Sequence, residues 1–279
     1  MAKPPATSTT HLILKLNEDI QNLAGQVRSI ELTKNARRKF NSEVERATLS
    51  LNSLLTELDP IERPHAVFDP GNPRTIAFFI ALALTAQKRQ PLRELRPFYG
   101  SGVYAIYYSG SLPFYAPLAR TETPIYVGQA APANENARTP TEQGIRLVAR
   151  LNEHRKNIER ASATLNVDDF QFRTLIVQTG WETGAENYLI RLFKPIWNKE
   201  TGLVYGIGKH GDSAQTRKNK ISPWDTLHKG RNWTGEEILA AKKSLEKIEI
   251  ELAEHFNATP VFQTEHDVLA AFLNGLRQL

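Results

Sequence analysis

The segment Gly102-Val103-Tyr104-Ala105-Ile106-Tyr107-Tyr108 decides the fold of this 279-residue chain. It is a run of β-branched and aromatic residues that begins after a glycine and ends before Ser109-Gly110, which is typical of a buried strand. A second run, Pro124-Ile125-Tyr126-Val127-Gly128, predicts a neighbouring strand. The connection of residues 109–123 is long for a hairpin, so it could form a loop that meets a ligand.

The elements that follow complete a small layered domain. Residues 170–177 alternate and then become continuously apolar, which predicts a third strand. Residues 144–160 predict a basic helix, and residues 75–90 a buried one. A further helix is expected to run to about Phe193, with Thr183 as its N-cap and Glu186 completing a capping box. The sequence therefore predicts an α/β (α+β) fold, a three-stranded sheet flanked by helices.

The first sixty residues follow a different pattern. Their apolar residues recur in steps of three and four, the a/d seam of a coiled coil, as in Ile13, Leu16, Ile20, Leu23, Val27 and Ile30 and again from Phe40 to Leu58. The two blocks change phase at Thr33-Lys34-Asn35, which indicates either a stammer in one long helix or a turn between two helices. The seam either packs on the chain's own domain or pairs copies of the chain, and its narrowness favours pairing.

These patterns predict three regions. Residues 1–60 form a helical coiled-coil segment for oligomerisation, residues 61–235 form the main domain with its ligand-contacting loops, and residues 236–279 form a helical tail. An amphipathic helix with mixed charge is expected from about Thr234 to Phe256, either as scaffold or as a second interface.

Composition narrows the chemistry and the surroundings of the protein. The chain has no cysteine, which excludes disulfides and thiolate metal sites, so any metal must bind oxygen or imidazole ligands. No apolar run approaches a membrane span and the N-terminus lacks a secretory signal, so we expect a cytoplasmic protein with no membrane partner. The net charge is +5, and positive charge is densest in residues 146–160 and 209–231, which favours a polyanionic partner.

Five elements in order then resemble a known family, the GIY-YIG nuclease superfamily: Gly102-Val103-Tyr104, Tyr126-Val127-Gly128, Arg150 with His154, Glu186 and Asn198. The spacing is most similar to its type II restriction endonuclease branch, which cuts the palindrome CCGCGG. The resemblance covers roughly residues 65–235. Val103 and Val127 replace the isoleucines of the namesake motifs and remain β-branched. The resemblance implies an enzyme that hydrolyses double-stranded DNA with Mg²⁺ (or Mn²⁺).

The spacing of Arg150 and His154 adds to this implication. Residues four apart project from one helix face, where a guanidinium can grip a phosphate. The alternative is a solvated basic face. By resemblance, Tyr104 is the general base, although an unperturbed phenol, with a pKa of about 10, is a poor base at neutral pH. We expect Arg150, His154 and a bound metal to lower the pKa of Tyr104.

The remaining catalytic roles also come from the resemblance. Tyr126 would orient the scissile phosphate or the water. Glu186 would bind the metal, because one carboxylate with waters and phosphate oxygens is a typical Mg²⁺ environment. Asn198 would support the phosphate or close the wall of the active site.

Two segments are candidates for reading the DNA sequence, because arginine and lysine can bind guanine edges. The first lies between residues 205 and 233 and contributes Lys209, His210, Arg217, Lys218, Lys220, His228 and Arg231. The second, residues 120–143, contributes Arg120, Gln129, Arg138 and Gln143, and Lys156 adds a charge from the basic helix. The alternative for the first segment is a mobile basic surface loop.

The two-fold symmetry of a palindrome predicts a homodimer on DNA. Pairing of the N-terminal helices would extend the dimer to a homotetramer. Two other readings stay open: a non-catalytic DNA-binding or coiled-coil scaffold protein, and a homing or repair-type GIY-YIG nuclease.

Overall fold

The computed structural model describes residues 9–59, 61, 68–208, 221–231 and 241–277. The chain divides into two compact units, Met1–His65 and Ala66–Leu279. This boundary lies five residues beyond the predicted one. The segment expected as a separate tail belongs to the second unit, because its buried residues Ile248, Leu252, Val268 and Phe272 lie in that unit's core.

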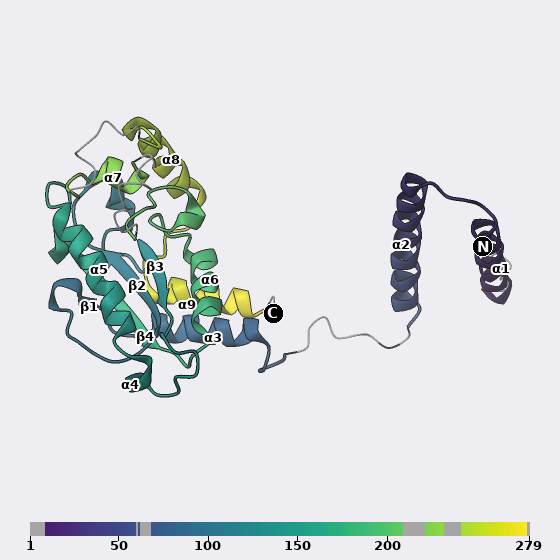
Figure 1. The fold of residues 1–279 in the computed structure, drawn as a ribbon, viewed down its shortest axis with the longest axis horizontal. Coiled ribbons are helices and arrows are strands. Elements are labelled where there is room, and N and C mark those ends of the chain that lie inside the picture. The colour runs from purple at the N-terminus through teal and green to yellow at the C-terminus, as the bar shows by residue number, and fades with distance from the viewer. Residues whose placement is uncertain (1–8, 60, 62–67, 209–220, 232–240, 278–279) are drawn as a thin grey trace, which may run out of the picture. The chain divides into compact units, whose positions relative to one another are not determined.

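Where the structure describes the first unit, it holds two helices, α1 (Thr9–Arg28) and α2 (Lys34–Glu57). The chain leaves the helical path at residues 29–33, and Thr33 caps α2 by accepting a hydrogen bond from the backbone N–H of Ala36. The turn alternative therefore holds over one continuous helix (Figure 1). The seam residues Ile13 and Leu16 are 56% and 40% exposed in the single chain.

The second unit is built on one antiparallel sheet with the order β1-β4-β2-β3. Its strands are β1 (Gln90–Pro91), β2 (Gly102–Tyr108), β3 (Tyr126–Ala130) and β4 (Phe170–Ile176). The three predicted strands are confirmed. The fourth, β1, has two residues and contains a proline, which is tolerated at an edge but gives no strand pattern in the sequence.

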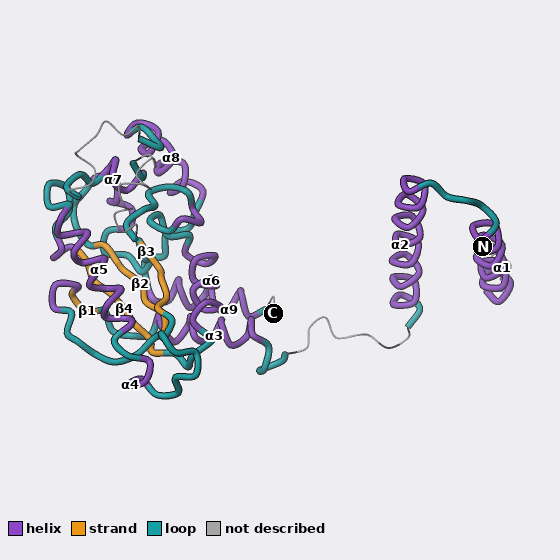
Figure 2. Tube along the Cα trace, viewed as in Figure 1, coloured by secondary structure: helices purple, strands orange, loops and turns teal. Residues whose placement is uncertain are grey.

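Helices cover both faces of the sheet (Figures 1 and 2). On one face, Tyr104, Ile106 and Tyr108 of β2 share a core with helix α5 (Arg146–Arg160). On the other face, the alternate residues Val103 and Ala105 share a core with three helices: α3 (Pro73–Thr85), α6 (Glu182–Phe193) and α9 (Glu265–Leu276). Successive strand residues point to opposite faces, so β2 is buried along its whole length.

The helices differ from expectation mainly at their ends. α8 (Leu245–Ala258) begins after the cap residue Ser244, whereas we expected a start near Thr234, and residues 232–240 lie outside the described ones. α9 was not expected. Among its described residues, the unit also holds the short helices α4 (Pro140–Gln143) and α7 (Pro223–Leu227) and four 3₁₀ turns (Leu92–Glu94, Pro113–Leu118, Val167–Asp169, Lys199–Thr201).

Across the described helices, none is long and apolar enough to cross a membrane.

Candidate active site

Tyr104 and His154 form the buried centre of the candidate site. The phenol oxygen of Tyr104 lies 2.7 Å from Nε2 of His154, and both side chains are 0% exposed. β2 directs Tyr104 toward the α5 face, and α5 carries His154 on the side that packs against the sheet. The donor in this contact depends on the ring tautomer: when Nε2 is unprotonated, the phenol donates to it and the ring proton lies on Nδ1.

The two glycine-containing motifs are explained by close contacts. A Cβ on Gly128 would lie 2.5 Å from both the Cζ and the hydroxyl oxygen of Tyr104, so the Tyr104 ring crosses β3 where no side chain stands. Gly102 has φ +149° and a Cβ there would lie 2.1 Å from the carbonyl oxygen of Leu175. Gly128 is therefore required by the Tyr104 ring, and Gly102 by its positive φ and the close backbone of Leu175.

Tyr126 completes the aromatic cluster. Its ring centroid lies 6.0 Å from that of Tyr104 and 4.7 Å from that of His154. Burial first, and the neighbouring Tyr126 second, raise the pKa of Tyr104 well above its usual value, while Arg150 acts in the opposite direction. Our expectation about Arg150 therefore has the right sign, but desolvation is the larger effect. The folded chain by itself keeps Tyr104 protonated.

Arg150 lies one turn before His154 on α5, as the spacing predicted. Its Nη1 is 2.5 Å from a carboxylate oxygen of Glu153, and about a third of its side chain is exposed. The backbone around Gly208 approaches the guanidinium, since a Cβ there would lie 3.8 Å from Nη2. Arg150 thus lies next to the tyrosine cluster, and the exposed part of its side chain could contact an anionic ligand.

Glu186 reaches the site from α6, but the predicted capping box is wrong. α6 begins at Glu182 after Trp181, which makes no side-chain cap, and Thr183 is already inside the helix. Glu186 instead accepts a hydrogen bond from the backbone N–H of Gln129 on β3. Burial first, and then the charge of Glu200, raise the pKa of Glu186 to about 7, against the smaller opposing effects of that hydrogen bond and Arg150.

The surroundings of Glu186 fit a divalent cation. The side-chain oxygen of Gln129, on the strand residue that donates to Glu186, is buried without a hydrogen-bond partner. A carboxylate under repulsion from Glu200 and an unsatisfied amide oxygen are hard oxygen ligands that a cation would stabilise. Within the described residues no group of three or more His, Cys, Asp or Glu lies together as a metal cluster.

Asn198 lies on the outer edge of β3. Its Oδ1 accepts from the backbone N–H of Val127 at 2.9 Å, and its Nδ2 donates to the Val127 carbonyl oxygen at 2.8 Å. β3 is an edge strand, so Asn198 and Glu186 satisfy adjacent backbone groups that would otherwise be open. The side chain of Asn198 is 4% exposed and is committed to the strand. Both polar groups of its side chain are therefore hydrogen-bonded to Val127.

The predicted DNA-reading residues fall into three groups. Arg120, Arg138 and Lys156 are exposed and Gln129 is half-buried. Arg120 lies beside the end of β2, because its backbone N–H donates to the carbonyl oxygen of Tyr108. Tyr108 is four residues along the strand from Tyr104, a distance of roughly 13 Å. A further five lie outside the described residues: Lys209, His210, Arg217, Lys218 and Lys220.

The assignment of His228 and Arg231 to DNA reading is wrong. His228 is 0% exposed, with its ring nitrogens 2.5 Å from the Tyr115 hydroxyl and 2.9 Å from that of Thr164. Burial first, and then Arg231, lower the pKa of His228 to about 3, so the ring is neutral. Arg231 is 2% exposed and paired with Asp225. Neither side chain can reach a base edge.

A buried polar network behind the site was missed. Gln143, expected in a reading loop, is 3% exposed; it accepts from the backbone N–H of Ser101 at 3.0 Å and donates to the Val177 carbonyl at 2.9 Å. The hydroxyl of Ser101 donates to Glu182, whose other oxygen accepts from the backbone of Gly180. These bonds tie the start of β2 to the approaches of α5 and α6. No local sequence pattern marks them, because they join residues up to 81 positions apart.

Comparison with known families agrees with the site. A family model described as the Eco29kI GIY-YIG domain matches residues 96–256, more than half of the chain, and that range holds all six predicted catalytic residues. No curated protein matches the chain.

Proposed function

Because the chain belongs to the Eco29kI GIY-YIG family, a nuclease family of restriction endonucleases, we propose that it is a type II restriction endonuclease. Its substrate would be double-stranded DNA carrying a short GC-rich palindrome, CCGCGG. The observation that carries the proposal is the pairing of Tyr104 with His154 beside Arg150, with Glu186 at the adjacent edge of β3.

The proposed chemistry begins with the phosphate. Arg150 binds a non-bridging oxygen, since a guanidinium forms paired hydrogen bonds with phosphate and stabilises charge that develops on it. Tyr104 accepts a proton from the attacking water as its own hydroxyl proton moves to Nε2 of His154, 2.7 Å away. The imidazole then carries the positive charge, and no isolated phenolate has to form in the buried pocket.

Glu186 supplies the carboxylate for Mg²⁺ or Mn²⁺. When bound, the ion would neutralise phosphoryl charge and stabilise the leaving 3′-oxygen. Tyr126 borders the same space and would orient the phosphate or the water, while Asn198 keeps the edge of β3 in place through Val127. The raised pKa of Glu186 means that binding of the ion competes with a proton near neutral pH.

The proposed quaternary structure follows from the substrate. A palindrome presents two equivalent phosphates, so two copies of the chain are needed for a double-strand cut. The exposed a/d seam of α1 and α2 supports further pairing into a tetramer. Light scattering that finds a monomer, with or without residues 1–58, would contradict this part. Because it acts on DNA, we expect the enzyme to work in the cytoplasm.

The test is a plasmid digest with Mg²⁺. A plasmid with one CCGCGG site should become linear, and a matched plasmid without the site should stay intact. Glu186→Ala should abolish cleavage and retain binding to the site in a gel-shift assay. Cleavage of both plasmids would refute the specificity and point to a homing or repair-type enzyme. Binding without any cleavage by the wild type would favour a non-catalytic DNA-binding protein.

A further inference from the structure

Arg231 forms a fully buried ion pair that the proposed chemistry does not use. Its guanidinium lies 2.6 Å from a carboxylate oxygen of Asp225, and the two side chains are 1% and 0% exposed. The Ser222 hydroxyl donates to the second oxygen of Asp225 at 2.5 Å. The guanidinium carbon of Arg231 also stands 4.6 Å from the centre of the Trp224 ring.

The remaining donors of Arg231 hold a loop. Nη2 donates to the carbonyl oxygen of Gly206 at 3.0 Å, and Nη1 donates to that of Ile207 at 3.1 Å. The Ile207 carbonyl receives a second bond from Nδ2 of Asn157 on α5, at 2.8 Å. The backbone of residues 206–207 is therefore clamped between a buried arginine and the helix that carries Arg150 and His154.

The clamped backbone lies next to Arg150, the arginine of the proposed chemistry. Gly208 follows the clamped pair, and a Cβ on it would lie 3.8 Å from Nη2 of Arg150. Asn157 lies three residues after His154 and is 6% exposed, so it projects from the packed side of α5. The backbone of residues 206–208 thus bounds the space in which the Arg150 guanidinium can lie.

A buried ion pair is a weak source of stability, because the cost of removing both charges from water is close to the attraction regained. Its value lies in fixing geometry. We propose that Arg231 and Asn157 are positioning residues that hold the backbone of residues 206–208 against α5 and thereby set the place of Arg150. This inference rests on the proposed nuclease function. Loop backbone that a catalytic guanidinium packs against must be fixed to within about 1 Å, since a misplacement of that size costs roughly 100-fold in rate.

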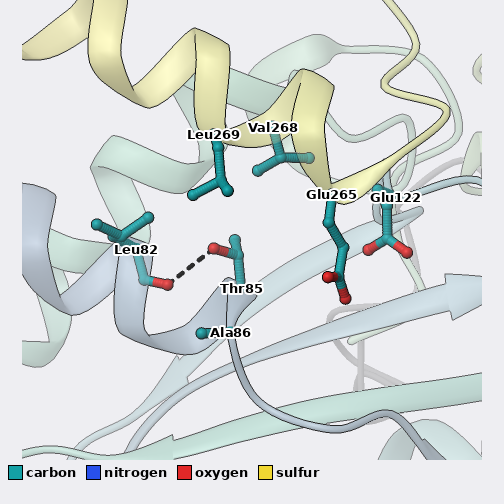
Figure 3. A pocket seen from close by; sticks show the side chains of 7 residues that line it. All are labelled: Leu82, Thr85, Ala86, Glu122, Glu265, Val268 and Leu269. Carbon is teal, nitrogen blue, oxygen red and sulfur yellow. Dashed lines mark hydrogen bonds between the residues drawn. The ribbon is translucent and has the colours of Figure 1, made fainter.

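The molecule contains a matched control. Arg173 also pairs with a carboxylate, Glu122, at 2.7 Å, donates to a backbone carbonyl, that of Gln87, and lies over the ring of Tyr107, with its side chain 4% exposed. Its partner Glu122 lines a cavity of about 170 Å³ between α3 and α9, where it lies near Glu265 (Figure 3). None of the predicted catalytic residues lines that cavity.

The experiment compares Asn157→Leu and Arg231→Lys with Arg173→Lys in the full-length protein. Single-turnover cleavage of a CCGCGG duplex is measured with Mg²⁺ at saturating enzyme, and the melting temperature and DNA Kd are measured alongside. We expect the first two variants to cut about 10–100-fold more slowly, with the Kd changed by less than about threefold. Arg173→Lys should lower the melting temperature and leave the rate unchanged.

A second measurement separates positioning from general damage. Asn157→Leu is repeated in an Arg150→Ala background, where a residue acting through Arg150 has nothing left to position, so its effect should vanish. If Asn157→Leu lowers the rate equally in both backgrounds, or no more than Arg173→Lys does, the inference is refuted. Should Arg231→Lys fail to fold, Asn157→Leu alone decides. A wild type that cuts no DNA refutes the proposed function instead, and the inference falls with it.

Discussion

The two halves of the candidate site differ in how well their polar side chains are paired. On the α5 face, Tyr104 and His154 are fully buried and hydrogen-bonded to each other. At the outer edge of β3, Glu186 carries a raised pKa, Glu200 repels it, and the side-chain oxygen of Gln129 has no hydrogen-bond partner. The first half joins its phenol and imidazole to each other, whereas the second leaves a carboxylate under repulsion and an amide acceptor without a hydrogen bond.

This difference separates what the protein supplies from what its ligands supply. A neutral, paired phenol and imidazole can be built in advance inside a core, because neither carries a charge that needs water. A carboxylate whose task is to bind a cation must be left partly unsatisfied, and the folded chain bears that strain until the ion arrives. The comparison therefore predicts opposite effects on stability and function when each half is altered.

The largest effect is expected from Glu186→Gln. Removing the charge should abolish both cleavage and binding of Mn²⁺. Binding is measured by electron paramagnetic resonance, in which the signal of the free ion decreases when the ion binds. The same change should raise the melting temperature at pH 8, by roughly 2–4 °C for each kcal/mol of repulsion and desolvation removed. A variant that binds Mn²⁺ as the wild type does would contradict the role of Glu186.

The pH dependence of the stability gained by Glu186→Gln distinguishes an electrostatic cause from a packing cause. The pKa of Glu186 is raised in the folded state, to about 7, so the unfolded chain loses this proton at lower pH than the folded chain. The wild type therefore loses stability as pH rises from the ordinary glutamate range to about 7. The advantage of Glu186→Gln in calorimetry should be largest above pH 7 and shrink toward pH 5. A pH-independent advantage would point to packing.

A smaller effect is expected from Tyr104→Phe, in the half of the site on the α5 face. The hydroxyl that joins water to His154 is lost, so the single-turnover rate should fall by roughly 10²–10⁴-fold. Unlike Glu186→Gln, the variant should not gain stability, because the His154 nitrogen at 2.7 Å loses its partner. Binding of Mn²⁺ should stay at the wild-type level. If the rate is unchanged, Tyr104 is not the base.

The smallest effect is expected from Glu200→Gln. This variant removes a charge near Glu186 and leaves Glu186, Tyr104 and His154 in place. Glu200 contributes to the raised pKa of Glu186 after burial, so the variant should move the acid limb of Mn²⁺ binding to lower pH. Affinity above pH 8 should weaken, because a nearby negative charge is gone. Gln171→Met is the control, because it lies on β4, which pairs with β1 and β2 but not with β3. No shift of the acid limb would show that burial alone sets this pKa.

Much of the candidate site could be predicted from the sequence because its signals are local. Strand patterning placed Tyr104 and Tyr126, and the spacing of four placed Arg150 and His154 on one helix face. The order of these residues indicated the family that the match over residues 96–256 then confirmed. Glu186 was also named, but its predicted capping role was wrong, because the helix begins one residue earlier than Thr183.

The basic C-terminal segment shows where local reasoning fails. Arginine and histidine in a positively charged stretch are usually exposed, so His228 and Arg231 were assigned to DNA. The chain instead folds this segment against the end of α5, where a Cβ on Gly230 would lie 2.0 Å from the Arg160 carbonyl oxygen. Asp225 and Tyr115 are among the partners that make that burial possible, and Tyr115 lies 113 positions away from His228.

The sequence by itself determined the main strands of the sheet, the tyrosine motifs and the placing of Arg150 and His154 on α5, because periodicity and spacing act within a few residues. Tertiary structure alone decided which polar groups are satisfied. It paired Tyr104 with His154, committed Asn198 to the edge of β3, buried Arg231 and left Glu186 with a raised pKa. Hydrogen bonding and desolvation depend on what comes near in space, and that is fixed only when distant segments pack together.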